Sequence, residues 1–207
     1  MAPVVYHANV IHPGMDAAEI EAMVNANTDA ISLSNAAGAA YRSGQYDEAI
    51  RLNQQALALK LRAYPEASVQ AAISLNALGE SLLGAGRLQE ADEAFAKALP
   101  VRESEGPGLD AAVTRDNIGA LREAQGRFAD AREIRLRGQQ SSKMVCGNYN
   151  CPTIKTFALK ELHACGACGS VFYCSKGCQV QDWAKRHKPL CRAHSASLQA
   201  SNQEATG

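Results

Sequence analysis

Apolar residues recur at helical spacing through residues 30–140, and the pattern occurs three times. The second half of each copy is "GQYDEAIRLNQQAL" (Gly44–Leu57), "GRLQEADEAFAKAL" (Gly86–Leu99) and "GRFADAREIRLRGQ" (Gly126–Gln139). Apolar positions at this spacing bury one face of a helix. One helical hairpin cannot bury its apolar face alone, so stacked copies share a core. The pattern therefore predicts three stacked helical hairpins.

Small residues occupy the same positions in all three copies. Each copy has a glycine suited to the left-handed turn that ends the first helix, at Gly44, Gly86 and Gly126. Further small residues precede and follow that glycine at fixed distances, at Ala37, Gly79, Gly119, Ala49, Ala91 and Ala131. They predict a close approach of the two helices of each hairpin. In the third copy Gly138 and Gln139 replace the Ala-Leu of the first two, which predicts a last helix that is short or that serves as a cap.

This pattern resembles the tetratricopeptide repeat over roughly residues 30–140. The resemblance implies a mostly α fold, a tetratricopeptide-like α-solenoid of three helical hairpins. Upstream, "DAAEIEAMVNAN" predicts another helix that starts with a capping box of Asp16 and Glu19. We therefore place the helical repeat domain at residues 15–142. In this family the first helix of each hairpin lines a concave face, which here would include Ser34, Gly38, Asn76, Glu80, Asp116 and Glu123.

The two ends of the chain predict little structure. Residues 1–14 are expected to form a flexible N-terminus, and residues 193–207, polar and rich in small side chains, a disordered tail. The N-terminus has no basic segment followed by an apolar run, and no apolar stretch approaches the roughly 20 residues that span a bilayer. We therefore expect an intracellular protein of the cytoplasm, the nucleus or both, with no membrane partner.

All seven cysteines lie after residue 145, and with one histidine they form four closely spaced pairs. The eight candidate ligands are Cys146, Cys151, Cys165, Cys168, Cys174, Cys178, His187 and Cys191. A reducing compartment favours metal ligands over disulfides. Because a structural zinc takes four ligands, eight ligands predict two Zn²⁺ per chain with no open position for catalysis. An iron–sulfur cluster is the alternative for thiolate-rich sites, and the histidine in seventh place argues against it.

The ligand order, six cysteines followed by a histidine and a cysteine, resembles the MYND zinc finger over residues 146–191. We place this finger at residues 143–192. The resemblance implies interleaved sites, one from Cys146, Cys151, Cys174 and Cys178 and the other from Cys165, Cys168, His187 and Cys191. Spacing alone leaves a sequential pairing open. The first cysteine pair and the long gap after Cys151 depart from the family pattern. The segment has too little apolar surface for an independent core, so zinc is expected to fold it.

A short helix is predicted over residues 176–187, ending before Pro189. It places Gln179 and Trp183 on one face. Trp183 either completes a small core with Val171, Phe172, Tyr173, Val180 and Leu190, or forms the wall of a peptide groove. The MYND resemblance implies the second role, with both residues contacting proline-containing peptides.

The finger segment is basic, with eight basic and two acidic residues in 143–195. A nucleic-acid patch is one interpretation. Thiolate ligands would offset much of this charge, and the segment has no base-reading pattern, so a solvated basic face is favoured.

We interpret the chain as a non-enzymatic, zinc-binding adaptor whose helical repeats and finger bind peptide segments of partner proteins. No catalytic or organic cofactor-binding residues are assigned. One alternative is part or a relic of a SET-type lysine methyltransferase system, since MYND fingers also occur inside those enzymes. No segment resembles a SET core, and too few residues remain for one. A further alternative is a transcriptional co-regulator with nucleic-acid contact.

Overall fold

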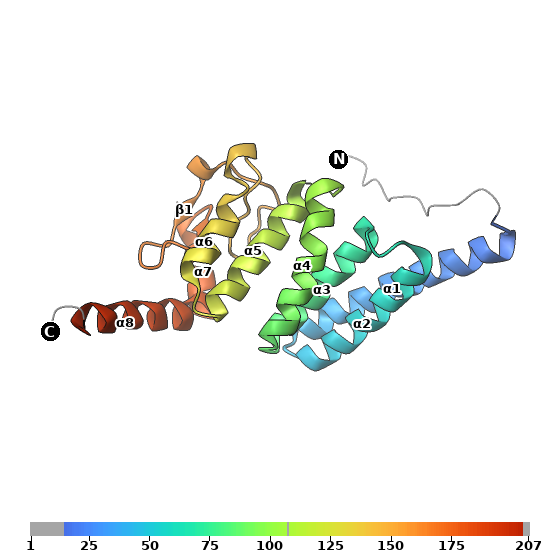
Figure 1. Cartoon of the computed structure of the whole chain (residues 1–207), viewed down its shortest axis with the longest axis horizontal. Coiled ribbons are helices and arrows are strands. Elements are labelled where there is room, and N and C mark those ends of the chain that lie inside the picture. The colour runs from blue at the N-terminus through green and yellow to red at the C-terminus, as the bar shows by residue number, and fades with distance from the viewer. Residues whose placement is uncertain (1–14, 107, 205–207) are drawn as a thin grey trace. The chain divides into compact units, whose positions relative to one another are not determined.

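The computed structural model describes residues 15–106 and 108–204 (Figure 1). The predicted flexible N-terminus, residues 1–14, lies outside the described residues. The chain divides into two compact units, residues 1–101 and 102–207. This division falls inside the second hairpin, whereas the domain boundary predicted between residues 142 and 143 stays a prediction. Each unit is described by itself below.

The first unit is built from helices α1 (Ala17–Arg42), α2 (Tyr46–Ala63), α3 (Val69–Gly84) and most of α4 (Leu88–Ser104). Helix α2 packs against both α1 and α3. The small residues predicted at the helix crossings are buried, and Ala37, Ala49 and Ala91 expose 1% of their surface or less. The capping box of Asp16 and Glu19 is present, but the helix that it starts continues through Arg42. The prediction of a separate upstream helix is therefore wrong.

The turn inside each hairpin has the same backbone geometry. Gly44, Gly86 and Gly126 have φ values of 77°, 75° and 77°. The residue after each glycine donates its N–H to the carbonyl five residues earlier, as from Gln45 to Ala40 at 2.9 Å. This bond satisfies a carbonyl that the helix end leaves unpaired, and the left-handed glycine makes it possible. The predicted left-handed turns are confirmed.

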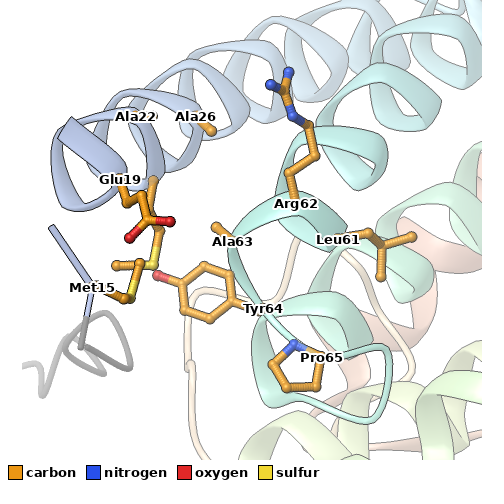
Figure 2. Close-up of a pocket in the computed structure, with 10 residues that line it drawn as sticks. Met15, Glu19, Ala22, Ala26, Leu61, Arg62, Ala63, Tyr64 and Pro65 are labelled. Atoms are coloured by element: carbon orange, nitrogen blue, oxygen red, sulfur yellow. The ribbon is translucent and has the colours of Figure 1, made fainter. Parts of the chain in front are cut away.

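A shallow hollow lies between the start of α1 and the end of α2 (Figure 2). Its lining is mostly apolar, with Met15, Ala22 and Ala26 from the α1 side and Leu61 and Pro65 from the α2 side. The lining contains no cysteine, histidine or serine. Its polar lining residues are Glu19, Arg62 and Tyr64, and this single carboxylate is too little for the ligand set of a metal site.

After the last residues of α4, the second unit continues with a hairpin of α5 (Gly108–Ala124) and α6 (Phe128–Leu136). Helix α6 has 9 residues, against 18 in α2, which confirms the predicted short last helix. The chain reverses at Gly138, where a β-carbon would lie 2.3 Å from the carbonyl oxygen of Lys143. A short turn of 3-10 helix, η1 (Gln139–Ser141), then leads into the cysteine-rich segment.

The cysteine-rich segment has little regular structure before its helices. It contains η2 (Leu159–Glu161) and a two-stranded antiparallel sheet of β1 (His163–Ala164) and β2 (Phe172–Tyr173), in which His163 pairs with Tyr173. A single bridge between Met144 and Phe157 fixes the start of the segment. These short pairings bring the cysteine-bearing loops together.

The described part of the chain ends with three helical segments, α7 (Lys176–Asp182), the π-helical turn η3 (Trp183–His187) and α8 (Lys188–Glu204), which follow one another without a break. The predicted helix end before Pro189 is wrong. The Lys188 N–H bonds to the carbonyl of Trp183, five residues back, and this wider turn precedes the proline, which occupies the first turn of α8. The predicted disordered tail is also wrong for residues 193–204, whose alanine, glutamine and glutamate favour helix.

Among the described residues, no helix combines the length and the hydropathy needed to cross a membrane.

Candidate metal centre

Two groups of four ligands are brought together in the second unit. One is formed by Cys146, Cys151, Cys174 and Cys178, the other by Cys165, Cys168, His187 and Cys191, and within each group the ligand atoms lie within 4.8 Å of one another. The sulfur atom of Cys174 lies 3.6 Å from the sulfur of Cys151 and 3.7 Å from the sulfur of Cys178. Tetrahedral zinc with Zn–S bonds of about 2.3 Å requires sulfur separations of about 3.8 Å. Both groups therefore fit a zinc ion, and the interleaved pairing is confirmed over the sequential one.

The first group is assembled from a loop, a strand end and a helix start. Cys146 and Cys151 lie on the loop after Met144, and the neighbouring Gly147 donates its N–H to the carbonyl of Phe172 in β2 at 2.8 Å. A β-carbon on Gly147 would lie 2.4 Å from Val171, so this loop approaches the sheet as closely as only glycine permits. Cys174 directly follows β2, and Cys178 lies in the first turn of α7, capped by Ser175. The atypical C-x4-C spacing thus still brings both cysteines to one site.

The second group combines a tight turn with the helical end of the chain. In the turn after β1, Cys165 donates its N–H to the carbonyl of Val171 at 2.8 Å, and Gly169 donates to the carbonyl of Cys165 at 2.8 Å. Gly169 adopts φ 69°, which favours glycine. His187 ends the π-helical turn and Cys191 follows one turn later in α8, both at 1% exposure or less. The sulfur of Cys168 lies 3.3 Å from Nε2 of His187.

The surroundings of Cys168 favour its metal-binding form. Burial alone would raise the pKa of this thiol, but hydrogen bonds with His187 and Ser170 outweigh burial and lower the pKa to about 6. The thiolate is the form that binds metal. The contacts of Cys168 with His187 and Ser170 therefore favour the thiolate.

The small core of the finger surrounds both ligand groups. Val171, Phe172 and Tyr173 are at most 2% exposed, and Trp183 packs against them from the π-helical turn. Val180 does not belong to this core, contrary to the sequence prediction, because 57% of its surface is exposed. The ligand cysteines themselves form much of the cluster, as expected of a segment with too few apolar side chains.

Two acidic residues of α5 are not where the sequence predicted them. Asp116 and Glu123 were expected on the concave face of the repeats, yet they are 5% and 1% exposed. Arg135 of α6 pairs with both, through Nε to Asp116 and Nη1 to Glu123, each at 2.6 Å. Arg135 also donates to the carbonyl of Ser170 at 2.9 Å, and the Ser170 hydroxyl donates to Glu123 at 2.7 Å. The third hairpin is therefore joined to the finger by buried polar contacts.

Sequence reasoning missed these residues, although a comparison of the three copies singles out Arg135. Arg135 stands nine residues after the turn glycine, where the other copies have Asn53 and Phe95, both at most 3% exposed. A charged residue at a position that is buried in the other copies requires a buried partner of opposite charge.

Two matches to the tetratricopeptide repeat model, at residues 28–104 and 69–137, together span more than half of the chain. The chain belongs to the tetratricopeptide repeat family. Residues 144–191 of this tetratricopeptide repeat protein match the MYND finger model. The predicted architecture, helical repeats followed by a two-zinc MYND finger, is thereby confirmed.

A relative among known proteins shares only a small part of this tetratricopeptide repeat protein. An F-box protein of Arabidopsis thaliana is 43% identical over 47 residues, which is 23% of this chain and 14% of the relative. No solved structure matches the chain significantly.

The two predicted peptide contacts of this tetratricopeptide repeat protein lie beside each other on the finger. Gln179 and Trp183 line one hollow together with Lys176, Val180 and residues Cys165–Ala167, the loop that begins at a ligand of the second group. Both side chains are partly exposed. Trp183 also stacks edge-on against the ring of His187, with centroids 5.8 Å apart. Its indole therefore contacts the core and a metal ligand while it lines the hollow.

Proposed function

We propose that this protein is a non-enzymatic, zinc-dependent adaptor whose finger binds extended segments of partner proteins, including proline-containing ones. Helical repeats and MYND fingers are both protein-interaction modules. The observation that supports the finer proposal is the hollow lined by Gln179, Val180 and Trp183. It combines an exposed apolar side chain, an indole and an amide within one helical turn.

The chemistry of this hollow suits an extended peptide. The indole of Trp183 offers a flat apolar face on which a proline ring or aliphatic side chain can pack. The amide of Gln179 can donate to and accept from a peptide backbone. Extended proline-rich segments lose little conformational entropy when they bind, so a few contacts suffice for weak affinity. We expect dissociation constants in the micromolar range or weaker, which corresponds to about −8 kcal/mol or less favourable.

Zinc supports this surface indirectly. Cys165 lines the hollow and belongs to the second ligand group, and Trp183 contacts the ligand His187. Loss of the second zinc would therefore remove the shape of the hollow. Peptide binding is expected to require zinc.

The test uses Gln179→Ala, because Trp183→Ala would also damage the core against which the indole packs. Fluorescence anisotropy with a panel of proline-containing peptides should show binding roughly threefold to tenfold weaker in this variant, the usual effect of losing one hydrogen bond. Gln89→Ala is the matched control, because Gln89 is exposed and its amide donates to Glu93 on its own helix. A fully zinc-loaded Gln179→Ala variant that binds every peptide as tightly as the wild type would refute the proposal.

A nucleic-acid function receives less support than a peptide function. Arg186, one of the basic residues of the finger, is engaged by Asp182 at 2.8 Å and by Glu123 at 3.1 Å. Lys155 lies 3.6 Å from Glu161. These pairings reduce the charge available for phosphate contacts. Zinc-bound thiolates suit a reducing compartment, so we place the protein in the cytoplasm or nucleus.

The methyltransferase alternative has a direct test. Incubation of the purified protein with labelled S-adenosylmethionine and a panel of lysine-containing substrates is expected to give background transfer. Transfer above background that depends on this chain would favour the enzyme over the adaptor.

A further inference from the structure

His187 has one ring nitrogen directed at the ligand group and one directed away from it. Nε2 lies 3.3 Å from the sulfur of Cys168, so this nitrogen is the one placed to bind zinc. The ring is completely buried, and Nδ1 has no hydrogen-bond partner within the described structure. When zinc occupies Nε2, the neutral ring carries its proton on Nδ1. A buried N–H of this kind requires an acceptor.

The carboxylate of Glu123 faces this nitrogen from the repeat helix α5. Its Oε2 atom lies 3.8 Å from Nδ1 of His187, and the Glu123 side chain is 0% exposed. A movement of less than about 1 Å would bring the two atoms within hydrogen-bond distance.

Glu123 is itself held in place by three other side chains. Its Oε1 atom accepts from Arg135 at 2.6 Å and from Ser170 at 2.7 Å, and its Oε2 atom accepts from Arg186 at 3.1 Å. Because Oε1 is fully engaged, Oε2 is the atom left to face His187. These three bonds therefore fix the orientation of the carboxylate.

We propose that Glu123, supplied by the third repeat, is the positioning residue of the zinc site formed by Cys165, Cys168, His187 and Cys191. It accepts a hydrogen bond from Nδ1–H of His187, which fixes the ring's tautomer and orientation and makes Nε2 a stronger ligand. Carboxylates behind metal-bound histidines have this effect, and losing one typically lowers metal affinity by 10- to 100-fold. The first zinc site has no histidine, so it should not depend on Glu123. Zinc affinity of the finger is thus set in part by a repeat residue.

The experiment measures both zinc ions in the full-length protein by competition with a chromophoric chelator. In Glu123→Gln, which keeps the size of the side chain but loses its charge, one zinc is expected to transfer at roughly 10- to 100-fold lower chelator concentration. The other zinc should transfer as in the wild type. Two unchanged zinc ions in this variant would overturn the proposal.

Asp116→Asn is the matched control for a purely structural role of Glu123. It removes the charge from the other buried partner of Arg135, also at 2.6 Å, and the Asp116 carboxylate is bonded to Arg135 rather than directed at His187. This variant should lose thermal stability and keep both zinc ions at wild-type affinity. If Asp116→Asn lost the second zinc as readily as Glu123→Gln, the effect would be general destabilisation and the positioning role would be wrong.

A measurement on the wild type does not depend on how the variants fold. In full-length protein labelled with ¹⁵N and loaded with ¹¹³Cd, His187 should show metal coupling to Nε2 and a slowly exchanging proton on Nδ1. Metal coupling to Nδ1, or a ring proton that exchanges freely with solvent, would contradict the proposal. The proposal concerns only the finger's metal ligation, so it can fail while peptide binding at Gln179 stands.

Discussion

Gly119 of α5 faces the guanidinium of Arg135, and a β-carbon there would lie 2.5 Å from its Cζ atom. Arg135 is 4% exposed and pairs with two buried carboxylates, so it has no room to withdraw. Only glycine at position 119 therefore leaves room for Arg135 to pair with both carboxylates. The equivalent Gly79 admits the ring of Phe95 in the same way, at 2.6 Å.

We predict that Gly119→Ala destabilises the second unit by about 2–3 kcal/mol. Alanine favours helix over glycine by about 1 kcal/mol, but displacing a buried arginine and overpacking the contact outweigh this gain. Urea unfolding followed by the fluorescence of Trp183, the single tryptophan, measures the effect on this unit. Gly177→Ala in α7 is the control, because its β-carbon would meet nothing closer than 3.8 Å. Equal stability of the two variants would contradict the prediction.

The zinc ligands could be predicted from the sequence, and Glu123 could not. Members of each ligand pair stand within five residues of each other, so local spacing identifies them. Glu123 lies 64 residues before His187, and only the packed fold brings the two together. The resemblance to tetratricopeptide repeats placed Glu123 on the same concave face as Asn76 and Glu80, where a charged side chain ordinarily meets solvent.

The hairpin turns show which features of an element a repeat can specify. In the second hairpin the N–H of Gly86 bonds to Leu83 and that of Arg87 to Leu82, at 3.0 Å and 2.9 Å. A β-carbon on Gly86 would meet no atom within 4 Å, so only its φ of 75° restricts the residue. The recurrence of glycine at this spacing was therefore sufficient to predict the turn.

We predict that Gly86→Ala lowers the free energy of unfolding by about 1–2 kcal/mol, the usual cost of a left-handed conformation for a residue with a β-carbon. Gly86→Asn should cost less, because asparagine tolerates this conformation better. Thermal unfolding followed by circular dichroism compares the three proteins. An alanine variant as stable as the wild type would mean that the turn can adopt another conformation.

The C-terminal helices extend further than local sequence signals predict. Pro189 ordinarily marks a helix boundary, yet the π-helical turn before it lets the chain continue as α8. His194 of α8 then stacks on Phe128 of α6, with ring centroids 4.0 Å apart. A tertiary contact of this kind cannot be read from the tail's polar composition, which alone predicted disorder.

The third hairpin and the finger belong to one compact unit, and this changes what zinc is expected to stabilise. Leu136 of α6 packs against the finger core, and Arg115 of α5 donates to the carbonyl of Lys143 at 2.8 Å. Together with the contacts of Arg135, these interactions fix one side of the hairpin. Sequence modules and units of packing therefore need not have the same boundaries.

Removal of zinc is expected to loosen α5 and α6 as well as the finger. Without the ions the apolar core of the finger is too small to keep it folded. The ion pair of Glu123 and Arg135 would then become exposed to solvent. Helices α1 and α2 belong to the other compact unit and contain no ligand. Hydrogen exchange of full-length protein with and without chelator should show lost protection in residues 108–136 and 144–191, and unchanged protection in residues 17–63. Chelation that leaves residues 108–136 fully protected would show that the third hairpin is stable without the finger. Lost protection in residues 17–63 would show that zinc stabilises the whole chain as one cooperative unit.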